Sequence, residues 1–274
     1  IENIDIGGVA LIRAAAKNFA NVAVVTDPQD YSVVLGAIDT SSLESLRPRL
    51  MAKAFRHTAY YDSMIARYFT RVAGAGDLTD TLTLGFRKVQ SLRYGENPHQ
   101  MAALYRDPLA PAGASAGRQM WGKELSYNNL LDADGAWELV ADLPKNACAI
   151  IKHGNPCGAA TAATCADSFR LSRDADPISA YGGIAAFHGV VDLAAAEAMA
   201  EKGNYLEVVL ATGFDEVAVE LFKNRSGWGQ NVRLIEAPLP PSTPDWAYRG
   251  VRGGLLVQNT DEEPEGTAWR QMTK

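Results

Sequence analysis

Beyond residue 80 the sequence alternates short apolar runs with helical patterns, and this alternation restricts the possible folds more than any other feature. The apolar runs predict buried strands, and they fall at residues 81–89, 146–153, 182–192, 207–213 and 231–237. Helical patterns are found between them, at residues 157–174, 194–203 and 215–224. Strands that alternate with helices in this way predict an α/β fold with a layered core.

The first 75 residues have a pattern richer in helix. Residues 8–18 predict a helix, and residues 21–31 predict a short buried strand followed by a turn. Residues 42–72 carry apolar positions at helical spacing, with a proline tolerable near the helix start. Because residues 73–80 are small and polar, we expect a boundary there, with domains at 1–75 and 76–274.

Composition narrows the class of protein. Of the 274 residues, 47% are hydrophobic and 21% are charged, which is typical of a folded globular chain. The formal charge of −6 provides no general attraction to nucleic acid, and no apolar run approaches the roughly 20 residues that cross a bilayer. Three cysteines are an odd number and fit a reducing compartment. We therefore expect a cytoplasmic protein that binds neither nucleic acid nor membrane.

The two ends of the sequence carry a separate expectation. The first residue is isoleucine, and residues 266–274 stop without a turn or a helix cap. We therefore expect a fragment that is cut at both ends.

The segment "AIIKHGNPCGAA", residues 149–160, places Lys152 and His153 together at the end of a predicted strand. A metal site is one interpretation, because zinc deaminases of nucleobases use a Pro-Cys-x-x-Cys turn and a glutamate near a ligating histidine. Here Cys157 has no second cysteine three residues later, and no glutamate stands two residues after His153. A tetrahedral zinc site cannot be completed locally, so we expect no metal.

Two other interpretations of this pair stay open from the residues alone. A histidine can accept a proton from an attacking amine, while an adjacent lysine can stabilise negative charge on a carbonyl oxygen. A loop at the strand end could bring His153 and Lys152 into one pocket. The alternative is an ordinary strand end, in which Lys152 is solvated and His153 bonds a nearby carbonyl.

Other segments suggest anion or nucleotide binding. In "SLRYGENPHQ", residues 91–100, Arg93 could grip a phosphate and Tyr94 could stack on a base, although an exposed arginine at a tight turn explains the same residues. In "DPISAYGG", the glycines at 182 and 183 allow close approach of backbone to a ligand, or simply form a turn.

The start of the chain offers one more candidate. "IENIDIGG" precedes a helix whose N-terminus could hold an anion, with Asp5 and Lys17 as polar groups of the site. The alternative is a helix cap at Asp5 and an ordinary lysine near the helix end.

The order of the motifs resembles one family. "ENIDIGG", "RAAAKN" and "VAVVTDPQDY" are followed by "LRYGENPHQ", "KELSYNNLLDADGAW", "IIKHGNPCG", "DPISAYGGIAAF", "EVVLATGF", "NVRLIE" and "RGGLLVQ". Together they resemble the bifunctional purine biosynthesis family, a fused phosphoribosylaminoimidazolecarboxamide (AICAR) formyltransferase and IMP cyclohydrolase. The resemblance covers essentially the whole chain and implies small-molecule partners, AICAR and 10-formyltetrahydrofolate, and a homodimer in the complete protein.

The resemblance also implies roles in formyl transfer. His153 is expected to accept the proton and Lys152 to stabilise the transition state, while Arg93 and Tyr94 match the nucleotide-binding pair. Gly182 matches a close-approach glycine and Glu207 an acidic nucleotide ligand. The implied fold of residues 76–274 is similar to cytidine deaminase without zinc.

For the first domain the resemblance implies the end of an IMP cyclohydrolase with a fold like methylglyoxal synthase. Asp5 and Ile6 match nucleotide-contacting residues, and Lys17 matches the catalytic lysine. The preceding phosphate-binding signatures of the family, Ser/Thr-Gly-Gly and Lys-Thr-Leu-His-Pro, are absent from this sequence. A second hypothesis is therefore kept, that of a nucleotide-binding α/β module without catalysis.

Overall fold

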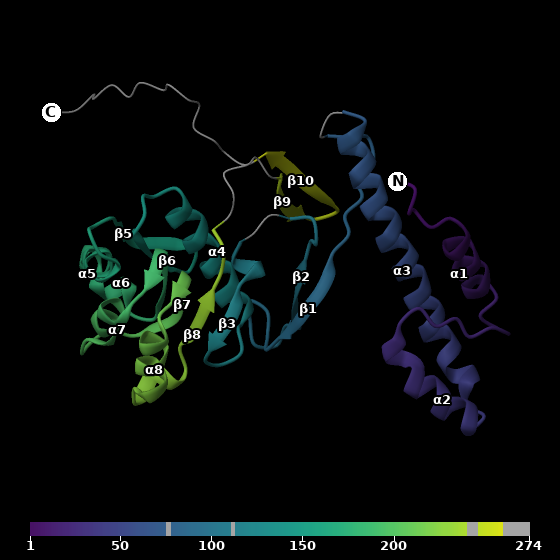
Figure 1. Ribbon diagram of the computed structural model, residues 1–274, viewed down its shortest axis with the longest axis horizontal. Coiled ribbons are helices and arrows are strands. Elements are labelled where there is room, and N and C mark those ends of the chain that lie inside the picture. Colours follow the sequence, from purple (N-terminus) through teal and green to yellow (C-terminus); the bar gives the residue numbers. More distant parts are fainter. Residues whose placement is uncertain (75–77, 111–112, 240–245, 260–274) are drawn as a thin grey trace. The chain divides into compact units, whose positions relative to one another are not determined.

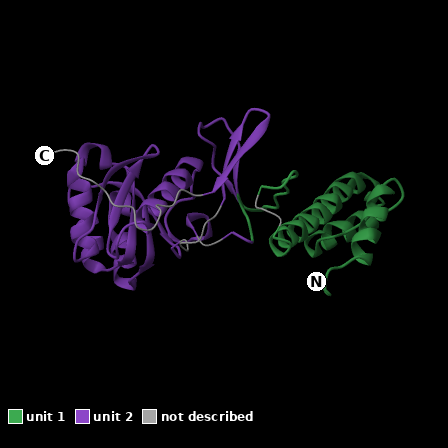
Figure 2. Ribbon diagram, turned by 90° about the horizontal axis from the view of Figure 1, so that it is seen from above, with its two compact units in different colours: residues 1–89, 105–108 green, residues 90–104, 109–274 purple. Residues whose placement is uncertain are grey.

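The computed structural model describes residues 1–74, 78–110, 113–239 and 246–259, which form two compact units. Unit 1 comprises residues 1–89 and 105–108, and unit 2 comprises residues 90–104 and 109–274 (Figure 2). Among the helices within these described ranges, none combines the length and the apolar character that a bilayer crossing requires.

The described part of unit 1 contains the α-helices α1 (Gly7–Lys17), α2 (Tyr31–Asp39) and α3 (Leu43–Val72), and α1 and α2 both pack against α3 (Figure 1). The two predicted helices at 8–18 and 42–72 are therefore confirmed. Pro48 is the sixth residue of α3, and the helix continues through it without the hydrogen bond that an N–H at this position would donate to the carbonyl of Glu44.

The strand predicted at residues 21–31 is wrong. Residues 22–27 belong to no strand, and the 3₁₀ helix η1 (Pro28–Asp30) follows them. A strand needs a neighbouring strand for its backbone hydrogen bonds, and no strand within the described part of unit 1 pairs with this segment. The apolar character of residues 22–27 is therefore not sufficient to predict a strand.

Two small antiparallel pairs add to the fold. β1 (Arg87–Leu92) pairs with β2 (Ala102–Arg106), and β9 (Trp246–Val251) pairs with β10 (Gly254–Asn259). The strand predicted at 81–89 therefore begins six residues later than expected. Both β1 and β2 contain residues of unit 1 and of unit 2.

Unit 2 contains a six-stranded mixed sheet in the order β3-β8-β7-β6-β4-β5. Its strands are β3 (Arg118–Trp121), β4 (Cys148–Lys152), β5 (Asn155–Ala160), β6 (Gly183–Val191), β7 (Leu206–Phe214) and β8 (Arg233–Glu236). The strands β6, β7 and β8 are parallel, while β4 is antiparallel to β6 and β5 is antiparallel to β4. The predicted strands at 146–153, 182–192, 207–213 and 231–237 and the α/β class are confirmed.

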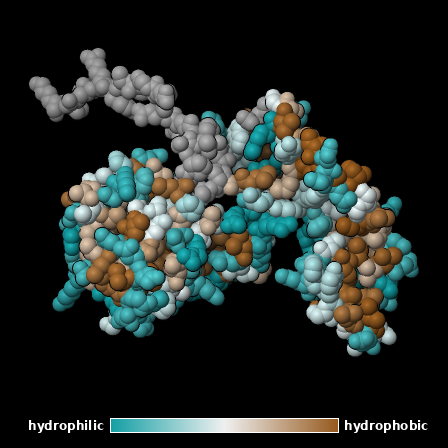
Figure 3. All heavy atoms as spheres, viewed as in Figure 1, coloured by the Kyte–Doolittle hydropathy of each residue, from teal (hydrophilic) through white to brown (hydrophobic). Residues whose placement is uncertain are grey.

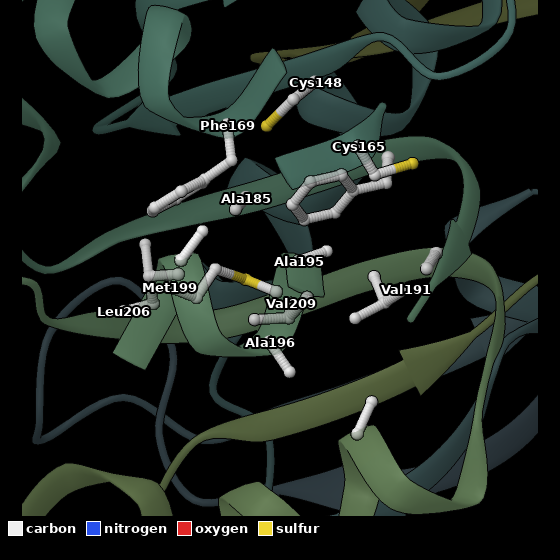
Figure 4. Close-up of a cluster of buried hydrophobic side chains, with 14 of the residues drawn as sticks. Cys148, Cys165, Phe169, Ala185, Val191, Ala195, Ala196, Met199, Leu206 and Val209 are labelled. Carbon is white, nitrogen blue, oxygen red and sulfur yellow. The ribbon is translucent and has the colours of Figure 1, made fainter. Parts of the chain in front are cut away.

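Helices cover both faces of this sheet, and residues alternate between the faces along each strand. On one face, Cys148 and Val209 pack with Phe169 of α5 (Cys165–Ala175) and Met199 of α7 (Leu193–Ala200), as Figure 4 shows. The helix α8 (Glu216–Asn224) packs on the same cluster. On the other face the apolar side chains pack beneath α4 (Tyr127–Ala141).

The helix predicted at 157–174 is wrong in its first half. Residues 155–160 form β5, the edge strand beside β4, and α5 begins only at Cys165, where the side chain of Thr164 accepts a hydrogen bond from the N–H of Asp167. Pro156 fits an edge strand because it donates no ladder hydrogen bond. Gly158 lies so close to α5 that a Cβ there would be 2.0 Å from the Ser172 carbonyl oxygen. This glycine therefore serves packing.

Candidate functional site

Three of the predicted formyl-transfer residues lie close together at one end of the strands of the six-stranded sheet, which we call the sheet edge. Because β4 is antiparallel to β6 while β7 and β8 are parallel to it, the end of β4 meets the beginnings of the other three. The register pairs Ile151 with Ile184, Gly183 with Leu206 and Val208 with Arg233. Lys152, Gly182 and Glu207 each lie one residue from these pairs, and so the sheet places them at the same edge.

Lys152 and His153 occupy a tight hairpin between β4 and β5. Lys152 pairs with Asn155, which leaves His153 and Gly154 as a two-residue loop. Their φ angles are 53° and 74°, the positive values that a type I′ turn requires at both central positions. Positive φ is uncommon for residues other than glycine, although histidine adopts it more often than most, and contacts from the surrounding structure favour it here.

The helix α4 contributes the group that holds this turn. The carboxylate of Asp132 accepts the N–H of His153 at 3.0 Å through Oδ2 and the N–H of Gly154 at 2.7 Å through Oδ1. The position of α4 is itself fixed by a capping box, in which Ser126 and Asn129 exchange hydrogen bonds at its start.

The side chain of Lys152 is half-buried beside β6. Its Nζ donates to the carbonyl oxygen of Tyr181 at 2.6 Å. Gly182 follows with a φ of 78°, and a Cβ at this position would lie 4.0 Å from the Lys152 Nζ and 3.4 Å from the ring of Tyr205. A glycine here therefore keeps the space beside the lysine open.

The pair lines an open depression of about 340 Å³, together with Asn155, Pro156, Cys157, Asp176 and Ser179. Asp176 accepts the hydroxyl of Ser179 at 2.6 Å and its N–H at 2.9 Å, and these bonds hold the pKa of Asp176 below its ordinary value. Burial raises the pKa of the Cys157 thiol. The depression thus presents an ammonium group, an exposed imidazole, a carboxylate and a neutral thiol.

Glu207 lies at the start of β7 and has several partners. Its Oε2 accepts from the amide of Asn129 at 2.9 Å and lies 3.5 Å from Nη1 of Arg233, and its Oε1 lies 3.5 Å from the hydroxyl of Tyr205. Arg233 is 7% exposed, and burial lowers its pKa. The acidic residue expected to bind nucleotide is thus already part of a polar cluster.

The loop carrying Arg93 and Tyr94 is tied to the same helix. The guanidinium carbon of Arg93 lies 5.2 Å from the ring centroid of Tyr94, a cation–π arrangement. In this loop the carbonyl of Glu96 accepts from the amide of Asn128 at 3.3 Å. The first two turns of α4 therefore contact the 91–100 loop, Glu207 and the His153 turn.

The sequence reasoning missed Asn129, Asp132, Tyr205 and Arg233. A signal for two of them was present in residues 126–137, where Ser126 and Asn129 have capping-box spacing and Asn129 and Asp132 are three residues apart on one helix face. Tyr205 and Arg233 carry no comparable signal, because only the strand pairing brings them to this edge.

The three candidate residues of unit 1 lie on or beside α1. Asp5 caps this helix, since its Oδ1 accepts the N–H of Gly8 at 3.1 Å, while its own N–H donates to the hydroxyl of Tyr61 at 2.8 Å. Ile6 is 76% exposed, and Lys17 is exposed in the last turn. A rise of about 1.5 Å per residue puts Lys17 about 15 Å from Gly7 at the start of the helix, on the side where Asp5 lies. The structure does not bring these two side chains together.

Among the residues that the structure describes, no three histidine, cysteine, aspartate or glutamate side chains are grouped so that they could hold a metal ion. Cys148 and Cys165 are buried in the core and Cys157 is half-buried.

A comparison with families of known proteins gives one match. The family model described as the AICARFT/IMPCHase bienzyme matches residues 15–274, a range that contains the His153 turn, the Arg93 loop and the sheet edge. Asp5 and Ile6 lie before the matched range. The resemblance seen in the motif order is confirmed, and the chain belongs to the AICARFT/IMPCHase family of bifunctional purine biosynthesis proteins.

Proposed function

We propose that unit 2 transfers a formyl group from 10-formyltetrahydrofolate to the 5-amino group of AICAR, with Lys152 and His153 as the reacting pair. The family implies AICAR formyl transfer and IMP cyclohydrolase activity in purine biosynthesis. The observation that carries the more specific proposal is the depression at the sheet edge, which Lys152 and His153 line together.

The chemistry of the reaction needs both side chains. The 5-amino group is a poor nucleophile, because its lone pair is delocalised into the imidazole ring, so a base must remove its proton as it attacks the formyl carbon. His153 is exposed at the depression and suits this role. The tetrahedral intermediate carries negative charge on the former formyl oxygen, which Lys152 would stabilise. Collapse expels the folate nitrogen, which takes up the proton that His153 holds.

Nucleotide binding is proposed for the residues around the reacting pair. Arg93 would hold the phosphate and Tyr94 would pack on the nucleotide, with Gly182 allowing close approach beside Lys152. Support comes from the position of Gly182, whose missing side chain leaves space next to the Lys152 Nζ. Glu207 would contact the nucleotide from the next strand, where Asn129 orients its carboxylate.

Ring closure to IMP is proposed for the unit 1 side of the protein, with Lys17 as the catalytic lysine and Asp5 and Ile6 as nucleotide contacts. Residues 1–75 would be the end of a cyclohydrolase domain of the methylglyoxal synthase type, and residues 76–274 would be part of a formyltransferase domain of the cytidine deaminase type. We further propose a cytoplasmic homodimer. Support for these assignments is the motif order together with the family match.

The test is substitution of the reacting pair in the full-length protein. His153→Ala and Lys152→Ala are each expected to lower the turnover of formyl transfer roughly a hundredfold, as loss of an acid–base or oxyanion group does. AICAR should still bind in calorimetry, and turnover of formylated nucleotide to IMP should be unchanged. The matched controls are His57→Ala and Lys145→Ala, which replace exposed residues outside the depression.

Two outcomes would contradict the proposal. Retention of wild-type formyl transfer in both variants would remove the pair from the mechanism. A wild-type protein that binds AICAR but transfers no formyl group would support the alternative, a nucleotide-binding module without catalysis.

A further inference from the structure

We propose that Asp132 is a positioning residue for formyl transfer, which acts by holding the backbone of the His153–Gly154 turn and thereby places the side chain of His153. This inference rests on the proposed role of His153. Asp132 lies 21 and 22 residues before the two residues whose N–H groups it binds, and it comes from a helix on one face of the sheet that carries the turn. In this hairpin the strand pairing ends at Lys152 and Asn155, so the N–H groups of the two loop residues lie outside the ladder. The carboxylate of Asp132 accepts both of them.

The contact is specific for a carboxylate. Each oxygen accepts one N–H, at 3.0 Å from His153 and 2.7 Å from Gly154, and hydrogen bonds to an ionised acceptor are stronger than neutral ones. An isosteric amide has only one acceptor oxygen, and its NH₂ group would face an N–H donor. The geometry therefore requires two acceptors on one planar group.

The turn needs such a restraint because of the residue it contains. Asparagine, aspartate and glycine are preferred where both central residues have positive φ, and here histidine occupies the first position with φ 53°. Without the carboxylate, the two N–H groups would turn to water and the histidine backbone would relax towards negative φ. The Cβ of His153 would then leave its position at the depression.

The helix α4, which carries Asp132, also contacts Glu207 at the start of β7. Asn129 lies one turn earlier on α4 and binds both the N–H of Ser126 and the carboxylate of Glu207. The same helix face thus holds the turn at the end of β4 and the acidic residue at the start of β7. A substitution at Asp132 should therefore move His153 while Asn129 keeps the carboxylate of Glu207 in place.

The experiment compares Asp132→Asn with Asp134→Asn in the full-length protein. Both variants remove one negative charge from α4, but no described backbone N–H of the turn bonds to Asp134. Asp132→Asn is expected to lower kcat for formyl transfer roughly ten- to hundredfold, as misplacement of a reacting group does, with KM for AICAR changed less than about twofold. Asp134→Asn should keep wild-type values.

A double-mutant cycle separates positioning from a general structural effect. If Asp132 acts only through His153, Asp132→Asn lowers turnover no further in a His153→Ala background. An equal loss in both backgrounds would overturn the inference, and so would wild-type turnover in Asp132→Asn alone.

The backbone amide resonances of His153 and Gly154 give a readout that does not depend on activity. Charge-assisted hydrogen bonds shift amide protons downfield, so both resonances should move upfield in Asp132→Asn and stay in place in Asp134→Asn. Unchanged resonances in Asp132→Asn would overturn the inference. If His153→Ala keeps full formyl transfer, the proposed function fails, and the amide resonances still decide whether Asp132 holds the turn.

Discussion

The two units differ in the size of the apolar side chains that they bury. In unit 2, helices cover both faces of the sheet, and Phe187 and Leu210 are fully buried on the two faces. In unit 1, the buried hydrophobic residues within the described range are Ala16, Ala37, Leu50 and Ala54, of which three are alanines. A sheet covered by helices on both sides therefore encloses large apolar side chains, whereas the helices described in unit 1 bury mainly alanines.

Unit 1 instead leaves apolar surface exposed and contains ion pairs between α3 and the segment before α2. On α2, Leu35 is 62% exposed and Ile38 is 53% exposed, and Figure 3 shows hydrophobic residues gathered over the helices of this unit. Lys53 of α3 donates to Asp27 at 2.5 Å and to Asp30 at 2.6 Å. The formyl-transfer site proposed above therefore rests on a packed core, whereas the residues proposed for ring closure lie on a helix with little burial.

The largest effect is expected from Phe187→Ala, which removes a fully buried ring from the centre of the unit 2 sheet. Loss of this contact should lower the free energy of unfolding of unit 2 by about 3–5 kcal/mol. Tryptophan fluorescence during urea unfolding measures this, because all five tryptophans of the sequence lie in unit 2.

The matched control is Phe86→Ala in unit 1, where the ring is 42% exposed. We expect a smaller cost there, about 1–2 kcal/mol, because 42% of the surface of Phe86 is already in water and less apolar area is lost. Circular dichroism of the helices measures this cost, because the tryptophans report on unit 2. Equal costs for the two phenylalanines would break the comparison between the units.

An intermediate effect is expected from Lys53→Ala in unit 1. Hydrogen bonds from Lys53 hold the pKa of Asp27 and of Asp30 below the ordinary value of 3.8. Carboxyls with lowered pKa values stabilise the folded state above their ordinary pKa, and this contribution is lost as the pH falls through the folded value. The variant should therefore unfold at a lower temperature at pH 7, with a smaller difference from wild type at pH values below 3.8.

Thermal unfolding followed by circular dichroism at several pH values measures this difference. Tryptophan fluorescence, recorded in parallel, gives the separate transition of unit 2 for comparison. Lys88→Ala is the control, because this lysine is exposed in β1 of unit 1. A pH-independent difference between Lys53→Ala and wild type would show that the ion pairs do not stabilise unit 1.

The smallest effect on stability is expected from Leu35→Gln on α2. Because this leucine is mostly exposed, the free energy of unfolding should change by no more than about 0.5 kcal/mol. Its contribution to an exposed apolar surface should appear in self-association, which we expect to decrease. Sedimentation velocity measures this, with Leu171→Gln in unit 2 as a control at similar exposure, 56%. A stability loss as large as that of Phe187→Ala would show that α2 is part of a core.

Local patterns in the sequence predicted most of the sheet of unit 2. Apolar runs identified β4, β6, β7 and β8, because strands buried on both faces are apolar at successive positions. The same criterion failed at residues 22–27, which are mostly apolar but have no partner strand in the described part of the chain. It also failed at residues 155–160, where small residues resembled the start of a helix. Period and composition describe one segment at a time, whereas a strand exists only through its neighbour.

The residue types of the candidate site were also visible in the sequence. Lys152 and His153 stood out as titratable groups at a strand end, and the motif order around them identified the family. Their chemistry follows from their side chains, which the sequence states directly. Which residues orient them does not follow, because Asp132 lies 21 positions before His153 in the chain.

The α/β class, the family and the two residues proposed as the reacting pair could thus be read from the order of the residues alone. The packing of α4 on the sheet was needed to show that His153 lies in a left-handed turn and that Asp132 holds this turn. It was also needed to show that Glu207 is shared among Asn129, Tyr205 and Arg233. The physical reason is that local preference and burial leave a periodic trace along the chain. A hydrogen bond between two distant segments leaves none, since it depends on the packing of a helix against a sheet.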